Sequence, residues 1–362
     1  MKRLGVIGAG QLGQMLGIAA RHLGISVTFL DPATDPPAAT VGPVISSPFD
    51  SEEGLARLAA ASDVITYEFE NVPVAAVLAI AARVPVFPPP AALRYAQDRW
   101  HEKQLFDSLQ IPVPRYARID SAADLTKAAE SLGLPLVLKT RRLGYDGKGQ
   151  LVIRSAAELD AAWRTLGPAA LIAEQWIDFD YEVSLIGVRR ANGDVVTYAL
   201  TENRHRDGIL RVSRAPSRST ALLEAARSYT KSLLERLDYV GVLALEMFAA
   251  GNALLANEFA PRVHNSGHWT IEGAVTSQFE NHLRAIFDMP LGDTASIGYA
   301  GMLNLIGNMP DNKSLPRHFP CFLHDYGKSP RPGRKLGHLT LLADDQLTLD
   351  QRLAALEHHF AV

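Results

Sequence analysis

The sequence is poor in cysteine, in net charge and in long apolar runs, and each shortage narrows the class of protein. Its single cysteine, Cys321, cannot form an internal disulfide. The 36 basic and 39 acidic residues nearly cancel, so the charge balance does not suggest binding to nucleic acid or to a membrane surface. The longest mostly apolar stretch, 73–87, is interrupted by Arg83 and is too short to span a membrane. We therefore expect a soluble protein of the cytoplasm.

The chain is long and apolar enough for two or three domains, with 362 residues of which 47% are hydrophobic. Over residues 1–110, short β-branched runs alternate with alanine-rich helical segments, which predicts a parallel, doubly wound α/β sheet. Pro112 and Pro114 stop any helix, so we expect a domain boundary there. A small α+β unit is expected over 111–177 and a larger α+β domain over 178–362. The expected strands are 4–7, 26–30, 63–67, 84–87, 135–140, 150–153, 170–174, 182–190, 194–200, 240–248 and 253–259, and the expected helices include 97–109, 122–132, 156–166 and 220–237.

Glycines at positions 8, 10 and 13 have the GxGxxG spacing between an expected strand and an expected helix. Backbone N–H groups and the helix dipole at such a turn favour a phosphate. Asp31 ends the second strand, where a dinucleotide-binding fold holds a ribose. These residues leave three interpretations open: a dehydrogenase, a site for another phosphate-bearing ligand, or a tight turn with a structural role only.

A second glycine-rich segment follows Lys139, which lies on an expected strand. Its three glycines let backbone amides approach a phosphate closely, and its three cations balance the phosphate charge. It is not a Walker loop, because no Ser or Thr follows Lys148 and the next element is a strand. The segment predicts a hairpin flap over a nucleotide, with a solvated turn bearing ordinary surface lysines as the alternative. The loop contains Arg141, Arg142, Gly144, Gly147, Lys148 and Gly149.

Two acidic residues, Glu246 and Glu258, interrupt strands that otherwise look buried, where an unpaired carboxylate is costly. If the two strands form a hairpin, these carboxylates converge beside Asn257, and oxygen ligands of this kind suit magnesium that bridges nucleotide phosphates. Pairing of the two acids with arginine is the alternative. Upstream, Glu174 ends an apolar strand, as expected where a hinge binds an adenine and a carboxylate accepts from ribose hydroxyls.

The segment 261–270 directly follows the second acidic strand and is dense in hydrogen-bond donors. The planar guanidinium of Arg262 suits two-point binding of a carboxylate or phosphate. We therefore place the reacting carboxylate beside this segment. The alternative is that its histidines have a structural role. His268, taken alone, fits either interpretation.

Five sequence blocks now resemble a known family. They are GQLG at 10–13, EFENV at 68–72, QDR at 97–99 with KQ at 103–104, GYDGKG at 144–149 and HNSGHWT at 264–270. The order of the expected domains resembles the ATP-grasp superfamily, and the blocks are similar to those of the 5-(carboxyamino)imidazole ribonucleotide synthases of purine biosynthesis. The resemblance spans nearly the whole chain. It implies an ATP-grasp fold with a Rossmann-like N-terminal domain, a small flap domain and a larger C-terminal α+β domain.

The resemblance implies a carbon–nitrogen ligase that uses ATP and magnesium. ATP would phosphorylate bicarbonate to carboxyphosphate, and the exocyclic amine of 5-aminoimidazole ribonucleotide would capture the carboxyl group. The products would be 5-(carboxyamino)imidazole ribonucleotide, ADP and phosphate. The family also suggests a homodimer, and the charge balance already argues against partners such as nucleic acid or a membrane.

The resemblance further implies a role for each matching residue. ATP binding is implied for Arg99, Lys139, Gly144, Tyr145, Asp146, Gly147, Lys148, Gly149, Gln150, Glu174, Gln175, Trp176, Ile177, Glu182, His205, Asn257 and Glu258. Catalytic roles, in holding bicarbonate and positioning the imidazole, are implied for Arg262, His264, Lys335, Asp146 and Tyr145. Binding of the ribonucleotide, with its phosphate at the front glycine turn, is implied for Gly10, Gln11, Leu12, Glu70, Asn71, Asn265, Ser266, Arg334 and Lys335. The magnesium ligands would be Glu246 and Glu258.

The chain departs from the family pattern at two positions. Gln14 stands where an arginine is usual, and this change is expected to weaken a contact with the ribonucleotide. Val263 replaces the usual proline before His264 and is expected only to loosen a turn.

Three other functions fit the sequence less well. An ATP-grasp formyltransferase that uses formate and glycinamide ribonucleotide shares the domain layout, but its block equivalent to 264–270 ends differently. A dehydrogenase leaves the flap and the paired acids unexplained. A non-catalytic nucleotide sensor would tolerate the loss of Glu246 or Glu258, yet both are present.

Overall fold

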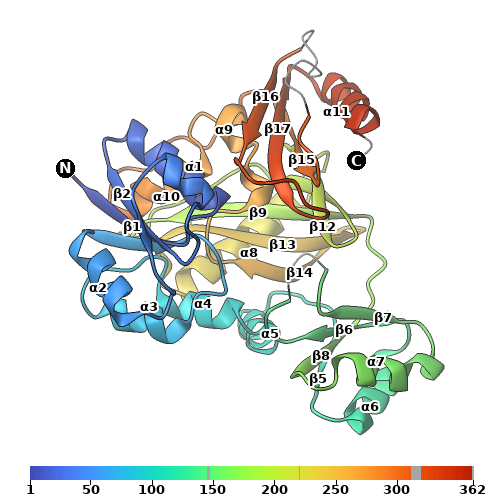
Figure 1. Cartoon of the computed structure of the whole chain (residues 1–362). Helices are drawn as coiled ribbons and strands as arrows, with labels where there is room; N and C mark the ends of the chain where they lie inside the picture. Colours follow the sequence, from blue (N-terminus) through green and yellow to red (C-terminus); the bar gives the residue numbers. More distant parts are fainter. Residues whose placement is uncertain (145–146, 220, 311–318, 361–362) are drawn as a thin grey trace.

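The computed structural model describes residues 1–144, 147–219, 221–310 and 319–360. Within these residues the strands form three sheets, and each sheet falls inside one of the ranges 1–110, 111–177 and 178–362. Figure 1 shows the N-terminal unit on one side of the molecule, while the small unit projects from the body below the large sheet. The mixed α/β and α+β fold expected from the sequence is confirmed.

The N-terminal sheet is parallel, with the strand order β3-β2-β1-β4 in the described part of the chain. Its elements are β1 (Arg3–Ile7), α1 (Gln11–His22), β2 (Ser26–Asp31), β3 (Val44–Ser46), α2 (Glu52–Ala60), β4 (Val64–Tyr67), α3 (Val74–Ala81) and α4 (Pro90–Ala96). Leu4 and Val6 of β1 pack into the core beside α1, whereas Ile7 packs into the core beside α2 and α3. Both faces of the sheet are therefore covered, as in a doubly wound fold. The expected strand at 84–87 is reduced to one bridge between Ile65 and Val86.

Helix α5 (Arg99–Ser108) leads into the small unit. The antiparallel sheet of this unit has the order β5-β8-β6-β7, and two helices cover it. Its elements are β5 (Tyr116–Ile119), α6 (Ala122–Leu132), β6 (Leu136–Thr140), β7 (Gln150–Ile153), α7 (Leu159–Leu166) and β8 (Leu171–Gln175). Strands β6 and β7 flank the glycine-rich loop, so the expected hairpin is confirmed.

The largest sheet contains nine strands among the described residues, in the order β14-β13-β9-β11-β12-β15-β17-β16, with β10 paired to β9. Its strands are β9 (Tyr181–Arg189), β10 (Val195–Thr197), β11 (Thr201–Arg206), β12 (Ile209–Ala215), β13 (Gly241–Ala250), β14 (Ala253–Ala260), β15 (Tyr299–Ile306), β16 (Cys321–Asp325) and β17 (Lys335–Ala343). Its helices are α8 (Leu223–Arg236), α9 (Thr270–Gly273), α10 (Gln278–Ile286) and α11 (Gln346–Phe360). The expected strand at 194–200 is the shorter β10, and the hairpin of β11 and β12 was not expected.

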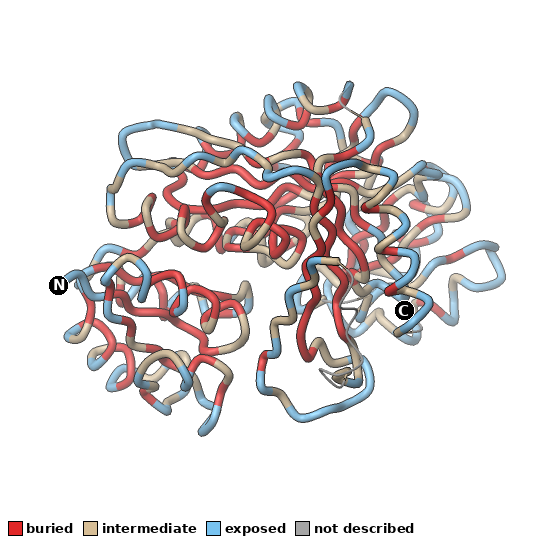
Figure 2. Tube along the Cα trace, turned by 90° about the horizontal axis from the view of Figure 1, so that it is seen from above, coloured by how far each residue is buried: buried red, intermediate tan, exposed pale blue. Residues whose placement is uncertain are grey.

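A buried histidine joins the N-terminal unit to the large sheet. His282 of α10 bonds through Nε2 to Thr66 Oγ1 at 2.9 Å, and its Nδ1 accepts from the Val242 N–H at 3.1 Å. Burial lowers the pKa of His282 to about 3, so the ring is neutral and accepts this bond. Figure 2 shows buried chain running through the strands, with exposed segments at the periphery. In the described ranges, no helix has the length and hydropathy needed to cross a membrane.

Candidate active site

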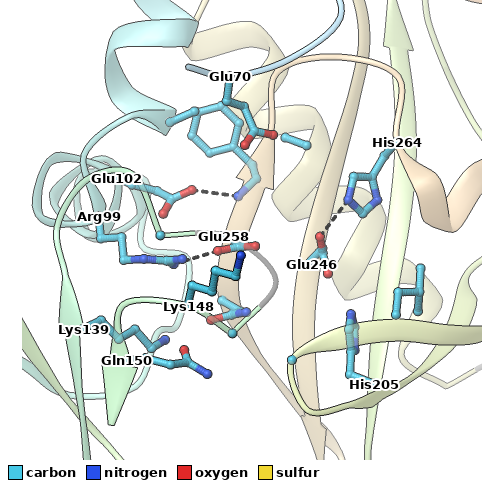
Figure 3. Close-up of a pocket in the computed structure, with 18 of the residues that line it drawn as sticks. Glu70, Arg99, Glu102, Lys139, Lys148, Gln150, His205, Glu246, Glu258 and His264 are labelled. Carbon is cyan, nitrogen blue, oxygen red and sulfur yellow. Dashed lines mark hydrogen bonds and ion pairs between the residues drawn. The ribbon is translucent and has the colours of Figure 1, made fainter. Parts of the chain in front are cut away.

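A cavity of about 420 Å³ lies where the three sheets meet, and its walls contain residues from all three units (Figure 3). The N-terminal unit contributes Gln11, Glu70 and Asn71. The small unit contributes Lys139, Lys148 and Gln150, and the large sheet contributes most of the remaining polar groups. Residues distant in the sequence thus converge on one site.

Helix α5 begins at this cavity, and its first residue, Arg99, points into it. Asp98 caps the helix by accepting from the Trp100 N–H at 3.1 Å, and it also accepts two bonds from Arg141 at 2.9 and 2.7 Å. Arg99 Nη1 donates to Glu258 Oε2 at 2.6 Å. Burial lowers the pKa of Arg99, but the nearby carboxylates, Glu258 foremost, outweigh burial and raise it above its ordinary value. This guanidinium remains charged and is available to an anion.

Lys139 of β6 lies on the same side of the cavity as Arg99 and donates to Glu174 Oε2 at 3.0 Å (Figure 3). Glu174 is 2% exposed, and Lys103 approaches the same oxygen at 3.7 Å. Burial raises the pKa of Glu174, but Lys103, Lys139 and Arg99 outweigh it and hold the pKa at about 2. The Glu174 carboxylate lies between these two lysines and does not line the cavity, and its expected contact with ribose hydroxyls stays a prediction.

Strands β13 and β14 bring the two predicted metal ligands together, because Glu246 and Glu258 are direct partners in the register. Asn257 also lines the cavity, and its buried Oδ1 has no hydrogen-bond partner. Burial raises the pKa of Glu246, but His264, His205 and Arg262 outweigh it and hold the pKa at about 2. No group of three His, Cys, Asp or Glu residues arranged for a metal is found in the described residues. Two carboxylates and one amide oxygen nevertheless fit magnesium, which keeps several waters and takes further oxygens from phosphates.

Arg262 and His264 lie at the far end of the same strand pair. Arg262 Nη2 is 2.6 Å from Glu70 Oε1, and His264 Nε2 is 3.1 Å from Glu246 Oε1. The neighbouring Asn265 lines the cavity, and neither its Nδ2 nor its Oδ1 has a partner within the protein. Buried polar groups normally have hydrogen-bond partners, so the Asn265 amide can pair with a polar group in the cavity.

His205 and Glu182 form another charged pair in the cavity wall. The His205 ring bonds to the Glu182 carboxylate across the neighbouring strands β11 and β9. A register shift between Arg204 and His205 marks an irregularity in β11 at this point. Burial lowers the pKa of His205, but Glu182 outweighs it and the net pKa is raised. Both residues are placed in the cavity, as predicted.

A further lysine, Lys328, was missed by the sequence reasoning. Its Nζ donates to Gln11 Oε1 at 2.5 Å, near the start of α1. Burial, together with the charges of Arg334 and Lys335, outweighs the opposing charge of Glu68 and lowers the pKa of Lys328 to about 8. The density of basic residues over 328–335 was the available signal.

The front glycine turn does not offer all its amides to a ligand. The Gly10 N–H donates to Glu68, and the Gly13 N–H donates to Glu68 Oε2 at 2.7 Å. Asp31 accepts from the Ala9 N–H at 2.8 Å. The Gly10 amide is thus already paired within the protein, and the implied role of Gly10 in binding the ribonucleotide stays a prediction. Asp31 closes the turn instead of facing a ribose. Gln11 and Leu12, one step along, do line the cavity.

Comparison with known proteins identifies the family. Residues 1–97 match the ribonucleotide synthetase preATP-grasp domain, 104–279 the ATP-grasp domain, and 300–352 the phosphoribosylaminoimidazole carboxylase C-terminal domain. The N5-carboxyaminoimidazole ribonucleotide synthase of Pseudomonas aeruginosa is 49% identical over 355 residues, which cover 98% of each chain. The chain belongs to the N5-carboxyaminoimidazole ribonucleotide synthase family.

Solved structures agree with this assignment. The N5-carboxyaminoimidazole ribonucleotide synthetase of Thermus thermophilus has a TM-score of 0.95 at 48% identity, with 99% of each chain covered. The N5-carboxyaminoimidazole synthase of Aspergillus clavatus, in complex with ADP and 5-aminoimidazole ribonucleotide, has a TM-score of 0.92 at 31% identity. That match covers 99% of this chain and 98% of the other. The ATP-grasp fold expected from the sequence is confirmed.

Some residues implied by membership of the N5-carboxyaminoimidazole ribonucleotide synthase family do not line the cavity, and their roles stay predictions. Ser266 is buried and accepts from Ser184 Oγ at 2.8 Å, and Arg334 donates to the Ser329 carbonyl at 3.2 Å. Tyr145 and Asp146 lie outside the described residues. The implied residues absent from the cavity wall are Gly10, Gly149, Glu174, Gln175, Ile177, Ser266 and Arg334.

The structure shows the surroundings of the two residues that depart from the family pattern, Gln14 and Val263. Gln14 donates to Thr40 Oγ1 at 3.1 Å, and Val263 is buried in the core. His268 is also buried, with its ring centroid 4.7 Å from that of His338, and it does not line the cavity. The structural interpretation of His268 is therefore the better one.

Proposed function

We propose that the cavity catalyses the ATP- and bicarbonate-dependent carboxylation of 5-aminoimidazole ribonucleotide at its exocyclic amine. The products are N5-carboxyaminoimidazole ribonucleotide, ADP and phosphate, made by way of carboxyphosphate. The observation that supports this most strongly is the placement of Arg262, His264 and Asn265 directly beyond the paired acids Glu246 and Glu258. A small anion held there lies next to the phosphates of a nucleotide bound between Arg99 and Lys139.

The nucleotide occupies the end of the cavity between the small unit and the large sheet. Arg99, Lys139 and Lys148 supply positive charge to its phosphates, and the glycine-rich loop covers them. Glu182 and His205 bind the ribose side, and the main chain near Trp176 frames the base. Glu246, Glu258 and Asn257 hold magnesium, which supplies Lewis-acid stabilisation of the charge on the transferring phosphoryl group.

Bicarbonate lies against Arg262 and His264, with the unpartnered amide of Asn265 beside it. Its oxygen attacks the terminal phosphoryl group of ATP, and ADP leaves. Carboxyphosphate hydrolyses readily, so water must be kept from it until the amine attacks its carbon and phosphate departs.

The ribonucleotide enters from the N-terminal side of the cavity. Gln11, Leu12 and Lys328 lie where its phosphate is bound, with Lys335 next to them. Glu70 and Asn71 face the sugar and the imidazole.

Membership of the N5-carboxyaminoimidazole ribonucleotide synthase family is also the basis on which we assign the protein to the cytoplasm and to a homodimeric state.

The test is ADP release with ATP, magnesium and bicarbonate, measured with and without 5-aminoimidazole ribonucleotide. The proposal expects release that depends on this ribonucleotide and on bicarbonate. Release only with formate and glycinamide ribonucleotide would reject the assigned substrate and favour the formyltransferase.

A further inference from the structure

Strand β14 is irregular at two of the residues that line the cavity, Asn257 and Glu258. Glu246 faces Glu258 across the hairpin, but the next residue of β13, Met247, faces Ala256, so Asn257 is an extra residue in β14. Successive residues of a regular strand point to opposite faces. The bulge removes this alternation, and both Asn257 and Glu258 line the cavity.

The bulge lies on an edge strand, because β14 ends the order of the large sheet. Its outer backbone groups therefore lack a neighbouring strand, and buried backbone groups need other partners. Helix α5 supplies them. Lys103 Nζ donates to the Asn257 carbonyl at 2.8 Å and to the Ala256 carbonyl at 3.3 Å, while Glu102 Oε1 accepts from the Phe259 N–H at 2.7 Å.

These contacts surround Glu258 on both sides. Lys103 holds the two carbonyls that precede it, and Glu102 holds the amide that follows it. Both side chains are almost fully buried, with Lys103 at 0% and Glu102 at 1% exposure. Two adjacent ionisable residues at such burial are costly unless they make specific bonds, and here their hydrogen bonds go to the backbone around Glu258.

The same helix, α5, also connects β14 with the small unit that bears the flap loop. Lys103 Nζ is 3.7 Å from Glu174 Oε2, and that oxygen accepts from Lys139 of β6 at 3.0 Å. One carboxylate thus connects the residue that holds β14 with the lysine of the small unit that faces the nucleotide.

We propose that Glu102 and Lys103 are positioning residues, which set the β14 bulge so that Asn257 and Glu258 act together on magnesium-bound nucleotide. This rests on the proposed function, because it takes Asn257 and Glu258 as the groups that meet the metal and the phosphates. Lys103 lies outside the cavity wall, whereas Glu102 lines it; both act through their bonds to the backbone of β14 and not through contact with a ligand.

The sharpest test compares two substitutions at one position. Glu102→Gln keeps a carbonyl oxygen that accepts from the Phe259 N–H, whereas Glu102→Leu removes it; both remove the same carboxyl group beside Glu258. Calorimetric titration with ADP is done in excess magnesium and again in EDTA. We expect Glu102→Leu to weaken binding in magnesium about tenfold, since groups that orient metal ligands typically contribute roughly 10- to 100-fold. Binding in EDTA, and binding by Glu102→Gln in either buffer, should change less than about twofold.

Lys103→Met provides an independent measurement and should give the same magnesium-specific loss, with the KM for ATP raised and the KM for the ribonucleotide unchanged. Equal losses in magnesium and in EDTA, or equal damage from Glu102→Gln and Glu102→Leu, would overturn the proposal. If Lys103→Met does not fold, the Glu102 pair decides the matter. Failure of the proposed carboxylation would appear as turnover independent of the ribonucleotide, which leaves this binding comparison unaffected.

Discussion

The two glycine-rich turns of the molecule differ in what faces them. The front turn, 8–13, surrounds a buried carboxylate: an added Cβ at Gly8 or Gly10 would lie 2.5 or 2.6 Å from Glu68. The flap loop lines the cavity with Gly144, Gly147 and Lys148, and the cations Arg99 and Lys139 stand opposite. The two turns therefore differ in their charged neighbours: a carboxylate occupies the Gly10 and Gly13 amides of the front turn, whereas cations lie near the flap loop.

The largest effect should come from replacing Glu258, a carboxylate at the end of the cavity where the nucleotide is proposed to bind. Glu258→Gln removes a charge from the metal and also breaks the pair with Arg99. We expect turnover to fall about a thousandfold, since metal charge stabilisation is worth several kcal/mol and about 1.36 kcal/mol is tenfold in rate. ADP release measures turnover, and far-UV circular dichroism should be unchanged. Normal turnover would reject the metal assignment.

A substitution in the front turn should first lower the stability of the folded protein. Glu68→Ala leaves the Gly10 and Gly13 N–H groups without their acceptor, at roughly 1–3 kcal/mol for each unsatisfied group. We expect the free energy of unfolding in urea to fall by about 3 kcal/mol. Glu130→Ala, at an exposed site on α6, is the control and should change little. Unchanged stability together with weaker ribonucleotide binding would show that the front turn resembles the flap loop after all.

Binding of the ribonucleotide should depend on pH through the protonation of Lys328. Its pKa is lowered to about 8, so the cation that binds a phosphate is lost as the pH rises through this value. We expect the KM for the ribonucleotide to rise above about pH 8, while the KM for ATP does not follow. Lys328→Met should raise the ribonucleotide KM about tenfold near neutral pH, since a hydrogen bond to a charged group is worth about 1.5–3 kcal/mol. It should also flatten the pH profile, and an unaltered profile would count against this role.

Lys335→Ala offers a related comparison at the same end. It should raise the requirement for the ribonucleotide far more than the requirement for ATP, because Lys335 lines the cavity on the side of Gln11 and Lys328. Steady-state titration of each substrate measures the two effects. Equal effects on both substrates would reject the assignment.

The smallest effect is expected in the flap loop itself. Gly147 has φ +74°, and an added Cβ would lie 2.9 Å from the Asp207 carbonyl oxygen. Gly147→Ala therefore strains the loop by about 1 kcal/mol or more and should raise the KM for ATP about fivefold. Gly193→Ala is the control, because Gly193 also has a positive φ but no neighbouring atom within 4 Å of an added Cβ. A change of the same size in both variants would show that the loop contact with Asp207 does not matter.

Much of the fold could be predicted from the sequence because its elements have strong local patterns. The helix expected at 122–132 and the strand expected at 150–153 have the bounds that the structure shows. The strand at 84–87 was overpredicted, because its apolar pattern belongs to a segment that forms only one bridge. The hairpin of β11 and β12 was missed, since its polar residues conceal the alternation that marks a strand.

The site was predictable where a residue interrupts a clear pattern. Glu246 and Glu258 stand out in apolar strands, and their pairing in the register follows from the hairpin. Glu174 stands out in the same way, but its partners lie on α5 and β6, and the sequence contains no sign of that contact. Lys328 and Lys103 were missed for a related reason, because a single lysine shows its importance only through distant neighbours.

The contact between α5 and β14 also bears on how the protein avoids aggregation. An uncovered edge strand presents free backbone groups that can template pairing with another chain. Lys103 and Glu102 occupy such groups on β14, so the helix that builds the nucleotide end also shields one margin of the large sheet. Glu102 and Lys103 therefore both protect the sheet edge and position the groups proposed for catalysis.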